Sequence, residues 1–307
     1  MSYVVFDLDE TMADLTVAHP FLLSLRIKDH ILEFHPYMLY FFPTALETML
    51  DQAYETFVER VLKAELSSEP LGILRPGLLP IMKQLAALKR KGLVKGVVIY
   101  SNNSHLPSLN FVKDVIELYT GPLICDCIHW LHASREADKT NPYIMKSWST
   151  LARIMHEGPC RAPKNLSPKN IYFFDDQQHV DMESALNEQY YRVPPYHSFT
   201  SVDRLSELYS SVIRDARVPL YEMLIYIVDI FQVENSTIQY NPAEATVDAL
   251  MNIIRKMVPA IIDTKRPVID NGILMMRDVI KEIRRKKRIH RYTLRGKRST
   301  VKNRVSK

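Results

Sequence analysis

The amino-acid sequence predicts an α/β protein built on a doubly wound parallel sheet. Three short apolar runs, each ending in polar or acidic residues, stand out: YVVFDLD, KGVVIYSNNS and KNIYFFDDQQHVD. Apolar runs without polar alternation are typical of strands buried on both faces of a sheet. Helical patterns separate these runs, and the alternation of strand and helix favours a parallel sheet with right-handed crossovers.

Chemically active side chains follow each of the three predicted strands. In a sheet of this kind the ligand site lies beyond the carboxyl ends of the strands, so these side chains are expected to meet in one crevice. They are Asp7, Asp9, Thr11, Ser101, Asn102, Asp175, Asp176 and, five residues beyond Asp176, Asp181.

Two helical patterns between the strands are expected to cover the sheet. RPGLLPIMKQLAALKRKG has Pro76 near its start, an apolar stripe, and basic residues with Gly92 at its end. Such residues mark the start and the end of a helix. NPYIMKSWSTLARIMH shows the same pattern, with Pro142 in its first turn. Residues 1–12 and 75–199 are therefore predicted to form the core domain.

Two other stretches are predicted to be helical and to lie outside this core. Residues 13–74 carry apolar residues at helical spacing with acidic residues on the opposite side, and we expect a helical insertion that projects over the crevice. Residues 200–283 contain four more helical segments and are expected to form an appendage packed on the sheet domain. Residues 284–307 have almost no core-forming side chains and are predicted to be a disordered basic tail.

Charge is divided unevenly along the chain. The net charge of the 307 residues is +5, yet residues 281–307 alone hold 13 Lys and Arg and one acid. The remaining 280 residues hold 27 basic and 34 acidic side chains, so the body is acidic and only the end is strongly basic. Basic charge is thus a property of one segment rather than of a domain surface. That segment fits a solvated tail, a nuclear-import-like patch or a weak, salt-sensitive nucleic-acid contact.

Neither export nor membrane insertion is predicted. The first apolar run, Tyr3 to Phe6, ends in acid and is too short for a signal peptide. The most apolar later stretch, LYEMLIYIVDIFQV, is too short and too interrupted by charge to span a bilayer. We therefore expect an intracellular protein, cytoplasmic or nuclear, without a membrane partner.

The residues at the strand ends indicate phosphate chemistry with a metal ion. Clustered carboxylates repel one another and raise each other's pKa unless a cation neutralises them. Hard oxygen ligands with open positions suit Mg²⁺, which completes its coordination shell with water and phosphate oxygens. One lysine and one hydroxyl nearby, for which Lys139 and Ser101 are the candidates, would contact the remaining phosphoryl oxygens. The set predicts an aspartate nucleophile that acts on phosphate with magnesium.

The first two of four ordered motifs resemble those of the haloacid dehalogenase (HAD) superfamily. DLDET, at residues 7–11, matches the D-x-D-x-T of motif one. Ser101, at the end of VVIYS, matches the Ser or Thr that ends an apolar strand in motif two. The resemblance covers roughly residues 1–195 and implies a HAD-like, Rossmann-like sheet.

The third and fourth motifs are matched by a lysine and by a group of acids. Lys139 is the best match to motif three, because KTNPYIMKSW is similar to the K-x-x-P helix start of the family, and Lys113 and Lys146 are its rivals. Motif four is matched by the pair Asp175 and Asp176 together with Asp181. Asp181 is equally suited to cap the helix predicted in DMESALNE.

The resemblance implies a role for each matched residue. Asp7 is implied as the nucleophile that forms an aspartyl-phosphate, and Asp9 as the general acid and base. Ser101 and Lys139 are implied to bind the phosphoryl group and to offset negative charge. Mg²⁺ is the implied cofactor. Its implied contacts are Asp7, Asp9 (through the backbone carbonyl), Asp175, Asp176 and Asp181, and the residues expected to bind substrate are Thr11 and Asn102.

The substrate is less sharply indicated than the chemistry. DLDET and the LRPG at residues 74–77 most resemble phosphatases that act on the C-terminal domain of RNA polymerase II, which favours a phosphoprotein. Those enzymes usually have Thr in motif two and a small β insertion, whereas this chain has Ser101 and a longer helical insertion. A helical cap is more typical of HAD enzymes that act on small phosphorylated metabolites, so a small-molecule or nucleotide phosphatase is the alternative.

A third alternative is an interaction protein of low activity. Such a protein would keep the HAD fold and bind partners through residues 200–283 and the basic tail. The combination of a compact HAD domain with a basic tail is also loosely similar to proteins of large DNA viruses.

Overall fold

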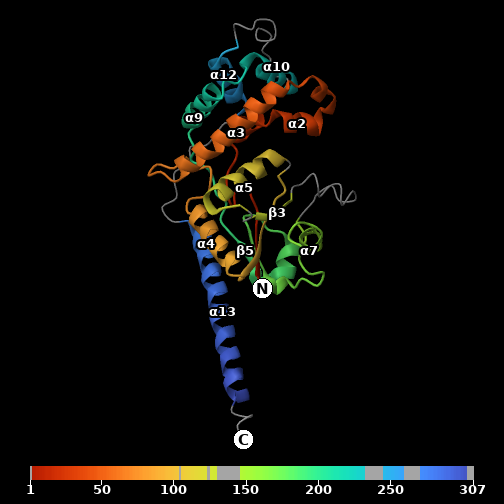
Figure 1. The fold of residues 1–307 in the computed structure, drawn as a ribbon, viewed down its shortest axis with the longest axis vertical. Coiled ribbons are helices and arrows are strands. Elements are labelled where there is room, and N and C mark those ends of the chain that lie inside the picture. The colour runs from red at the N-terminus through yellow and green to blue at the C-terminus, as the bar shows by residue number, and fades with distance from the viewer. Residues whose placement is uncertain are drawn as a thin grey trace.

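The computed structural model describes residues 2–103, 105–122, 125–129, 146–231, 245–258 and 270–302. Its centre is a five-stranded sheet in which all neighbouring strands are parallel (Figure 1). The strand order is β3-β2-β1-β4-β5, and the bounds are β1 Ser2–Phe6, β2 Val94–Tyr100, β3 Cys125–His129, β4 Ile171–Asp175 and β5 Tyr190–Arg192. The predicted α/β parallel sheet is confirmed, and β1, β2 and β4 are the three strands that the sequence predicted.

Side chains of β1 alternate between two hydrophobic clusters, one on each face of the sheet. Val4 and Phe6 pack into the larger cluster, whereas Tyr3 and Val5 pack into the smaller one. All four are buried. Because both faces of the sheet are covered, no position of β1 favours a polar residue, which explains the continuous apolar run in the sequence.

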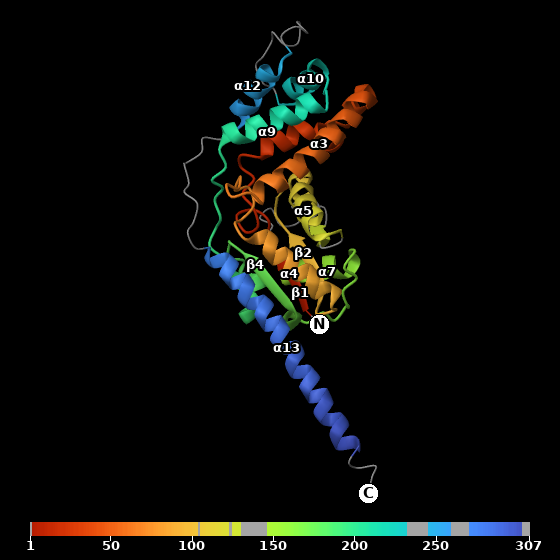
Figure 2. The same ribbon diagram turned by 60° about the vertical axis from the view of Figure 1, so that its left-hand side comes forward.

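Helices cover both faces of the sheet (Figure 2). On the side of the larger cluster, the described helices that cover the sheet are α4 (Leu78–Arg90), α5 (Leu106–Thr120) and the first half of α13 (Asn271–Lys302). On the side of the smaller cluster, the helices in the described part of the chain are α7 (Trp148–Glu157) and α8 (Val180–Leu186). Two short 3₁₀ turns, η2 (Pro168–Asn170) and η3 (Asn187–Gln189), precede β4 and β5. The core therefore has three layers, with the sheet in the middle.

The start of α4 is set by a glycine in a left-handed conformation. Gly77 has a φ of 90°, which strongly favours glycine, and the helix begins at the next residue. A Cβ atom at Gly77 would lie 3.2 Å from the side chain of Ile273 in α13, so the position also allows the two helices to approach closely. The predicted helix start in RPGLLP is thus found one residue after this glycine.

The helix predicted from Asn141 begins later than its sequence pattern indicated. In the structure α7 starts at Trp148, and the hydroxyl of Ser147 accepts a hydrogen bond from the backbone N–H of Thr150. A serine that accepts this bond satisfies a free N–H of the first helical turn and so fixes the helix start. Residues 141–145 lie outside the described residues, and Lys146 precedes the helix rather than lying inside it.

A separate group of helices, which we call the helical layer, lies at one end of the sheet domain (Figure 1). It combines two segments that are far apart in the sequence. The first segment contributes α1 (His19–Leu25), α2 (Ile27–Phe34), η1 (Pro36–Phe41) and α3 (Thr44–Glu65), and the second contributes α9 (Val202–Asp215), α10 (Leu220–Phe231) and α12 (Val247–Met257). Tyr209 of α9 joins the two segments, because its hydroxyl lies 2.6 Å from Ser24 Oγ and its ring packs edge-on against Phe21.

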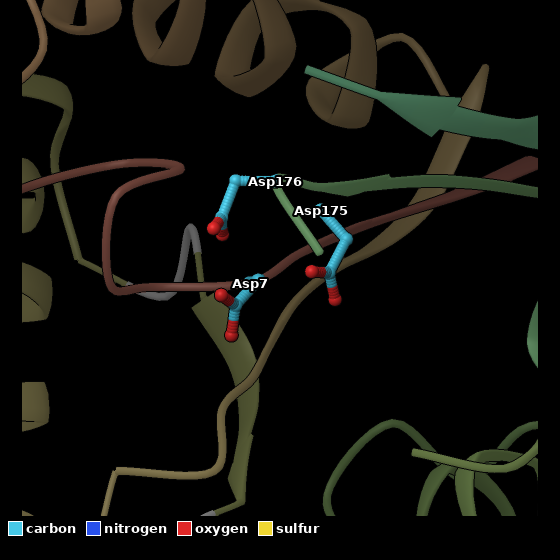
Figure 3. A group of neighbouring side chains, drawn as sticks. All are labelled: Asp7, Asp175 and Asp176. Carbon is cyan, nitrogen blue, oxygen red and sulfur yellow. The ribbon is translucent and has the colours of Figure 1, made fainter. Parts of the chain in front are cut away.

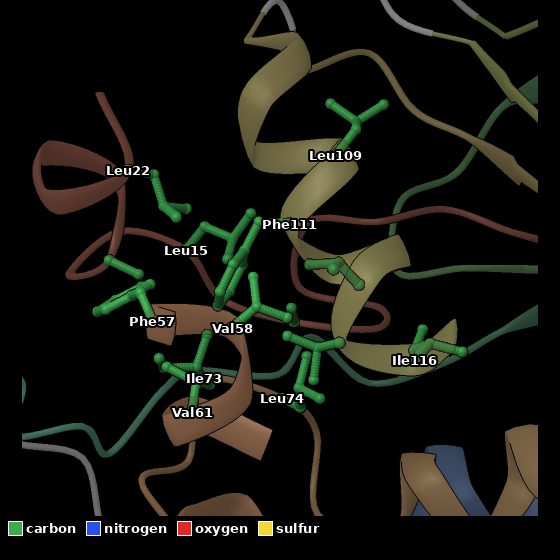
Figure 4. Close-up of a cluster of buried hydrophobic side chains, with 14 of the residues drawn as sticks. Leu15, Leu22, Phe57, Val58, Val61, Ile73, Leu74, Leu109, Phe111 and Ile116 are labelled. Atoms are coloured by element: carbon green, nitrogen blue, oxygen red, sulfur yellow. The ribbon is translucent and has the colours of Figure 1, made fainter. Parts of the chain in front are cut away.

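This helical layer rests on α5 of the core. Figure 4 shows Phe57, Val58 and Val61 of α3 together with Leu109 and Phe111 of α5, and the ring centroids of Phe57 and Phe111 lie 5.8 Å apart. All five side chains are buried in the larger hydrophobic cluster, so the helical layer and the sheet domain share one continuous core.

The predicted appendage of residues 200–283 is divided between two places. Helices α9, α10 and α12 join the insertion, whereas α13 returns to the sheet domain and packs against α4. Each of these helices has an apolar stripe, and a stripe shows only that a helix is packed, not which partner covers it. The division was therefore invisible in the sequence.

The insertion begins and ends at a narrow connection beside the end of β1. Ala13 pairs with Leu74 in an antiparallel bridge, and the backbone N–H of Asp14 donates to Ile73 O at 3.0 Å. Arg75, which is buried, donates from Nη2 to the carbonyl oxygens of Glu10 and Pro194. The LRPG motif thus supplies a side chain that links the loop after β1 to the chain after β5.

Helix α13 extends well beyond the body of the protein. Its first half is buried through Ile273, Met276, Val279, Ile280 and Ile283, and its second half projects away from the sheet domain (Figures 1 and 2). The structure is therefore helical to Lys302, where the sequence predicted a disordered tail from residue 284. Lys and Arg are good helix formers, and the packed first half avoids the cost of starting a new helix. No helix in the described part of the chain is long and apolar enough to cross a membrane.

Candidate functional site

The candidate site lies where the order of the strands reverses. From β1 the chain proceeds outward through β2 and β3, and it then returns to the other side of β1 through β4 and β5. Ligands of open α/β sheets bind at such a reversal, beyond the carboxyl ends of the strands. Asp7 directly follows β1, Asp175 ends β4, and the backbone N–H of Asp7 donates to Phe174 O at 2.8 Å. Strand pairing therefore brings the acids of two distant motifs together.

Three carboxylates form a compact buried group at this position, which we call the acidic cluster: Asp7, Asp175 and Asp176. One oxygen of each lies within 4.8 Å of the others, and Figure 3 shows the side chains converging from the ends of β1 and β4. Their exposed fractions are 5%, 0% and 8%. Metal–oxygen distances of about 2 Å allow one ion to contact all three groups, so the acidic cluster can hold a divalent cation.

Lys146 supplies positive charge to the acidic cluster. Its Nζ lies 2.5 Å from Asp7 Oδ1 and 2.7 Å from Asp175 Oδ2, and the residue is only 2% exposed. Burial by itself would lower the pKa of Lys146, but the charges of the two aspartates outweigh burial and raise it. The ammonium group therefore stays charged. Lys139, the lysine predicted for this role, lies outside the described residues.

The two aspartates beside Lys146 have opposite pKa shifts. Burial raises the pKa of Asp7 well above its usual value, against the opposing effect of Lys146. Burial also acts to raise the pKa of Asp175, but the neighbouring His179 and Lys146 outweigh it and lower that pKa. Asp175 Oδ1 further accepts a hydrogen bond from the backbone N–H of Gln177 at 2.9 Å. Asp175 is thus the better stabilised carboxylate, and Asp7 is the one with most to gain from a bound cation.

Thr11 positions the third carboxylate of the acidic cluster. Its Oγ1 donates to Asp176 Oδ1 at 3.1 Å, and the residue is fully buried. The loop that carries Thr11 is a tight turn, in which Met12 N–H donates to Leu8 O and Glu10 has a φ of 54°. The threonine was predicted to bind substrate; in the structure it holds Asp176.

Asp9 is held by residues that follow β2. Asn103 Nδ2 donates to both Asp9 oxygens, at 3.1 and 3.0 Å, and Ser101 Oγ donates to Oδ2 at 3.4 Å. Ser101 Oγ also accepts from the backbone N–H of Asn103, which ties the three residues together. Burial raises the pKa of Asp9, against the opposing effects of Asn103, Lys146 and Ser101. The backbone carbonyl of Asp9, predicted to contact the metal, accepts from Thr11 N–H.

Asp181 and Asn102 were also predicted for the site, and neither belongs to the acidic cluster. Asp181 is exposed, and its Oδ2 accepts a hydrogen bond from the backbone N–H of Trp148, the first residue of α7. Because α8 begins at Val180, Asp181 lies within its first turn, beyond the loop of Asp175 and Asp176. It caps a helix, although a different one from that which the sequence suggested. Asn102 is partly buried in the loop after β2.

Sequence reasoning missed or set aside three residues of the site. Asn103, beside the predicted Asn102, is the residue that contacts Asp9. His179, interpreted as a loop residue, is buried with Nε2 at 3.4 Å from Asp175 Oδ2. Lys146 was only a rival candidate, yet a helix start in Ser147-x-x-Thr150 would have placed it just before a helix at the edge of the crevice.

A cavity of about 370 Å³ adjoins Asp9 and extends under the helical layer. It is lined by residues of the site and of the helical layer, namely Asp9, Glu10, Asp14, Leu15, Thr16, His19, Pro20, Asn103 and Met257. Burial lowers the pKa of His19, so this histidine is neutral near pH 7. The lining therefore carries three carboxylates and, among the residues described, no lysine or arginine.

Comparisons with protein-family models, with curated protein sequences and with solved structures found no match to this chain.

Proposed function

We propose that this protein is a Mg²⁺-dependent phosphatase that hydrolyses a phosphomonoester through an aspartyl-phosphate on Asp7. The supporting observation is the meeting of three buried carboxylates with one buried ammonium group at the reversal of strand order. A bound Mg²⁺ would neutralise the charge of the phosphoryl group and orient it for displacement. The resemblance of DLDET to motif one of HAD phosphatases supports the same chemistry.

In the first step, a carboxylate oxygen of Asp7 attacks phosphorus and the bond from phosphorus to the ester oxygen breaks. Asp9 donates its proton to the departing oxygen, a role that its raised pKa favours. In the second step Asp9 takes a proton from water, the water oxygen attacks phosphorus, and phosphate leaves with Asp7 regenerated.

The surrounding residues of this chain hold the reacting groups in place. Lys146 offsets negative charge that Asp7 and the phosphoryl group bring together. Asn103 donates hydrogen bonds to both oxygens of Asp9 and so restricts the rotation of the Asp9 carboxyl group. Thr11 fixes Asp176, one of the carboxylates that would hold the ion.

Magnesium is expected to stabilise the protein in proportion to its binding. At 100 times its dissociation constant, a ligand of the folded state adds about 2.7 kcal/mol to the free energy of unfolding. Titration of Mg²⁺ into metal-free protein should therefore raise the melting temperature. In Asp176→Asn the increase in melting temperature should be smaller, and the rate of p-nitrophenyl phosphate hydrolysis should be lower. Asp181→Asn is the matched control, because Asp181 lies outside the acidic cluster. An equal response to Mg²⁺ in wild type and Asp176→Asn would contradict the metal assignment.

The cavity under the helical layer favours the second candidate, a small-molecule phosphatase, over a phosphoprotein phosphatase. It adjoins Asp9, the residue proposed to protonate the leaving group, and about 370 Å³ is within the range of small-ligand pockets. Residues of α1 and α12 form part of its wall, so the leaving group would be held beneath the helices. Activity on a phosphoprotein remains a prediction from the sequence.

The charge of the cavity lining predicts which leaving groups are accepted. With three carboxylates and no described lysine or arginine in the lining, a neutral or cationic leaving group is favoured over an anionic one. We expect kcat/KM for phosphoethanolamine or a polyol phosphate to exceed that for a nucleoside bisphosphate at least about tenfold. Glu10→Gln removes one of the three carboxylates and should therefore lower the ratio of the two kcat/KM values.

A phosphoserine peptide that is hydrolysed better than every small ester would instead support the phosphoprotein candidate. A nucleoside bisphosphate preferred over phosphoethanolamine would contradict the charge argument.

A further inference from the structure

Three hydrogen-bonded side chains lead from the loop after β2 to the wall of the cavity that adjoins Asp9. Ser108 Oγ lies 2.7 Å from Nδ1 of His105 and 3.3 Å from Nδ1 of His19, and His19 is one of the residues that line the cavity. Ser108 and His105 are buried, with exposed fractions of 0% and 7%. Buried polar groups are nearly always hydrogen-bonded, and this constrains where each proton of the three side chains lies.

Both imidazole rings are neutral near pH 7. Burial, together with the neighbouring His19 and His30, lowers the pKa of His105 to about 3, and burial also lowers the pKa of His19. A neutral imidazole carries its one ring proton on either Nδ1 or Nε2. The hydroxyl of Ser108 has a single proton as well, so it donates to one of the two Nδ1 atoms and accepts from the other. The two histidines therefore carry their protons on different nitrogens.

The surroundings of His105 decide which nitrogen carries the proton in each ring. Nε2 of His105 is buried and has no hydrogen-bond partner in the described part of the chain. A buried N–H group without an acceptor is rarer in proteins than a buried acceptor without a donor. The proton of His105 is therefore placed on Nδ1, which donates to Ser108. Ser108 in turn donates to Nδ1 of His19, and His19 carries its proton on Nε2.

The Nε2–H group of His19 is available to a ligand in the cavity. The ring lines the cavity, and its Nδ1 is already engaged. The other side-chain donors of the described lining are engaged too, because Asn103 Nδ2 donates to Asp9 and Thr16 Oγ1 donates to Asp14. His19 is thus the residue of this lining that offers a ligand a side-chain N–H, and this N–H needs an acceptor.

The carboxylates of the lining differ in how fully the protein itself satisfies them. Asp14 accepts from Thr16 through Oδ1 and from the backbone N–H of Ser198 through Oδ2. Glu10 makes a looser contact, with Oε1 at 3.8 Å from Nδ1 of His197, and its side chain is 43% exposed. Glu10 can therefore accept a hydrogen bond from a ligand in the cavity.

We propose that the substrate is the phosphate ester of a polyol, with one hydroxyl of the leaving group bound between Nε2–H of His19 and the carboxylate of Glu10. This proposal rests on the phosphatase function proposed above and names its leaving group. A hydroxyl accepts one hydrogen bond and donates another, as the two protein groups require, whereas an ammonium group can only donate. An ammonium group bound there would leave the N–H of His19 without an acceptor, which offsets its attraction to the carboxylates.

The residues after β2 hold the proposed acid and the proposed leaving-group contact together. Asn103 Nδ2 donates to both oxygens of Asp9, and Asn103 Oδ1 accepts from the backbone N–H of His105 at 2.7 Å. His105 and Ser108 then determine which nitrogen of His19 carries the proton, so both act as positioning residues. An ester whose hydroxyl is bound by His19 therefore meets Asp9 in a fixed orientation, which favours proton transfer to the leaving oxygen.

The first test locates the ring protons and needs no activity. Long-range ¹H–¹⁵N spectra of full-length protein labelled at histidine, recorded at about pH 8, distinguish protonated from bare ring nitrogens, and His19→Phe and His105→Gln assign the signals. His156 is an internal standard, because its Nδ1 lies 2.7 Å from the carbonyl oxygen of Ala162, which can only accept. We expect the proton on Nε2 of His19 and on Nδ1 of His105. A proton on Nδ1 of His19 would overturn the proposal.

The second test compares two esters of similar size, 2-hydroxyethyl phosphate and phosphoethanolamine. Wild type should have the higher kcat/KM for the hydroxyl ester, and His19→Phe should lower the ratio of the two values about tenfold, because it removes a hydrogen bond made only to the hydroxyl. Ser108→Ala should lower the ratio about twofold, since His19 then carries its proton on Nε2 in only part of the molecules. The spectra of Ser108→Ala should show this mixture directly.

His156→Phe is the matched control, because His156 lies in α7 on the opposite face of the sheet. It should leave the ratio of the two kcat/KM values unchanged. An equal or higher kcat/KM of wild type for phosphoethanolamine would overturn the polyol assignment, as would an unchanged ratio in His19→Phe.

Hydrolysis of p-nitrophenyl phosphate separates a failure of this proposal from a failure of the proposed function. Hydrolysis of p-nitrophenyl phosphate without a preference for the hydroxyl ester would refute the leaving-group assignment alone. If wild type with Mg²⁺ hydrolyses none of the three esters, the phosphatase function is refuted, and the leaving-group assignment with it.

Discussion

Asp7→Asn is expected to abolish hydrolysis while leaving the protein folded. The substitution removes the only nucleophile of the proposed mechanism, and loss of a nucleophile lowers kcat by at least about 10⁴-fold in enzymes that use covalent catalysis. Hydrolysis of p-nitrophenyl phosphate with Mg²⁺ measures this loss. Equal rates for wild type and variant would contradict the mechanism and would favour the interaction protein of low activity.

The same substitution should not destabilise the metal-free protein. Burial raises the folded-state pKa of Asp7 above its unfolded value of about 3.9, so its contribution to stability is greatest below about pH 4 and is lost as pH rises through the folded-state pKa. Near pH 7 the buried charge of Asp7 is therefore unfavourable without a bound metal ion, even beside the Lys146 ammonium group, and Asn removes that charge. Urea unfolding in EDTA should give a free energy of unfolding for Asp7→Asn no lower than for wild type.

Magnesium should reverse this order of stabilities. The ion binds wild type through Asp7 as well as Asp175 and Asp176, whereas the variant retains two of the three carboxylates. A clear drop in stability of Asp7→Asn in EDTA would show that the Asp7 charge is compensated within the protein alone, chiefly by Lys146.

Lys146→Met is expected to have the largest effect on stability. The change leaves the Asp7 and Asp175 carboxylates buried without their shared cation, and removal of one partner from a buried ion pair costs about 3–5 kcal/mol. Urea unfolding in EDTA measures this cost. Added Mg²⁺ should restore part of it, because the ion supplies positive charge at the same carboxylates, and hydrolysis should remain low.

Two other lysines serve as controls for Lys146. Lys113, a partly exposed lysine, pairs with Asp114 and Glu117 on the surface of α5, so Lys113→Met should cost no more than about 1 kcal/mol. Lys139→Met tests the lysine that the sequence favoured for motif three. A loss of hydrolysis in Lys139→Met, with Lys146→Met unaffected in both stability and hydrolysis, would return the role to Lys139.

The parts of the fold that the sequence predicted are those that local patterns determine. β1, β2 and β4 are buried on both faces, and that environment selects a continuous apolar run. β3 and β5 were missed because they are short and lie at the edges of the sheet, where burial imposes less of a pattern. The pairing of the insertion with α9, α10 and α12 depends on contacts between distant segments, which no local pattern records.

In the candidate site, too, local sequence patterns predicted some residues, whereas others depend on contacts between distant segments. Asp7, Asp9 and Thr11 follow one strand with fixed spacing, so their places could be predicted together. Lys146 enters the acidic cluster from another part of the chain, and its role depends on where α7 begins. The competing proline pattern at Pro142 concealed that helix start.

The two-segment origin of the helical layer limits how far the chain can be shortened and still fold. Its two halves come from residues 14–73 and 201–257, and Tyr209, Ser24 and Phe21 meet at the seam between them. A fragment that stopped at residue 199, after the last strand of the sheet, would expose the hydrophobic side of α3 that α9 covers and the side of α4 that α13 covers. The smallest piece that keeps its hydrophobic core covered is therefore nearly the whole polypeptide, so the acidic cluster cannot be separated from the helical layer.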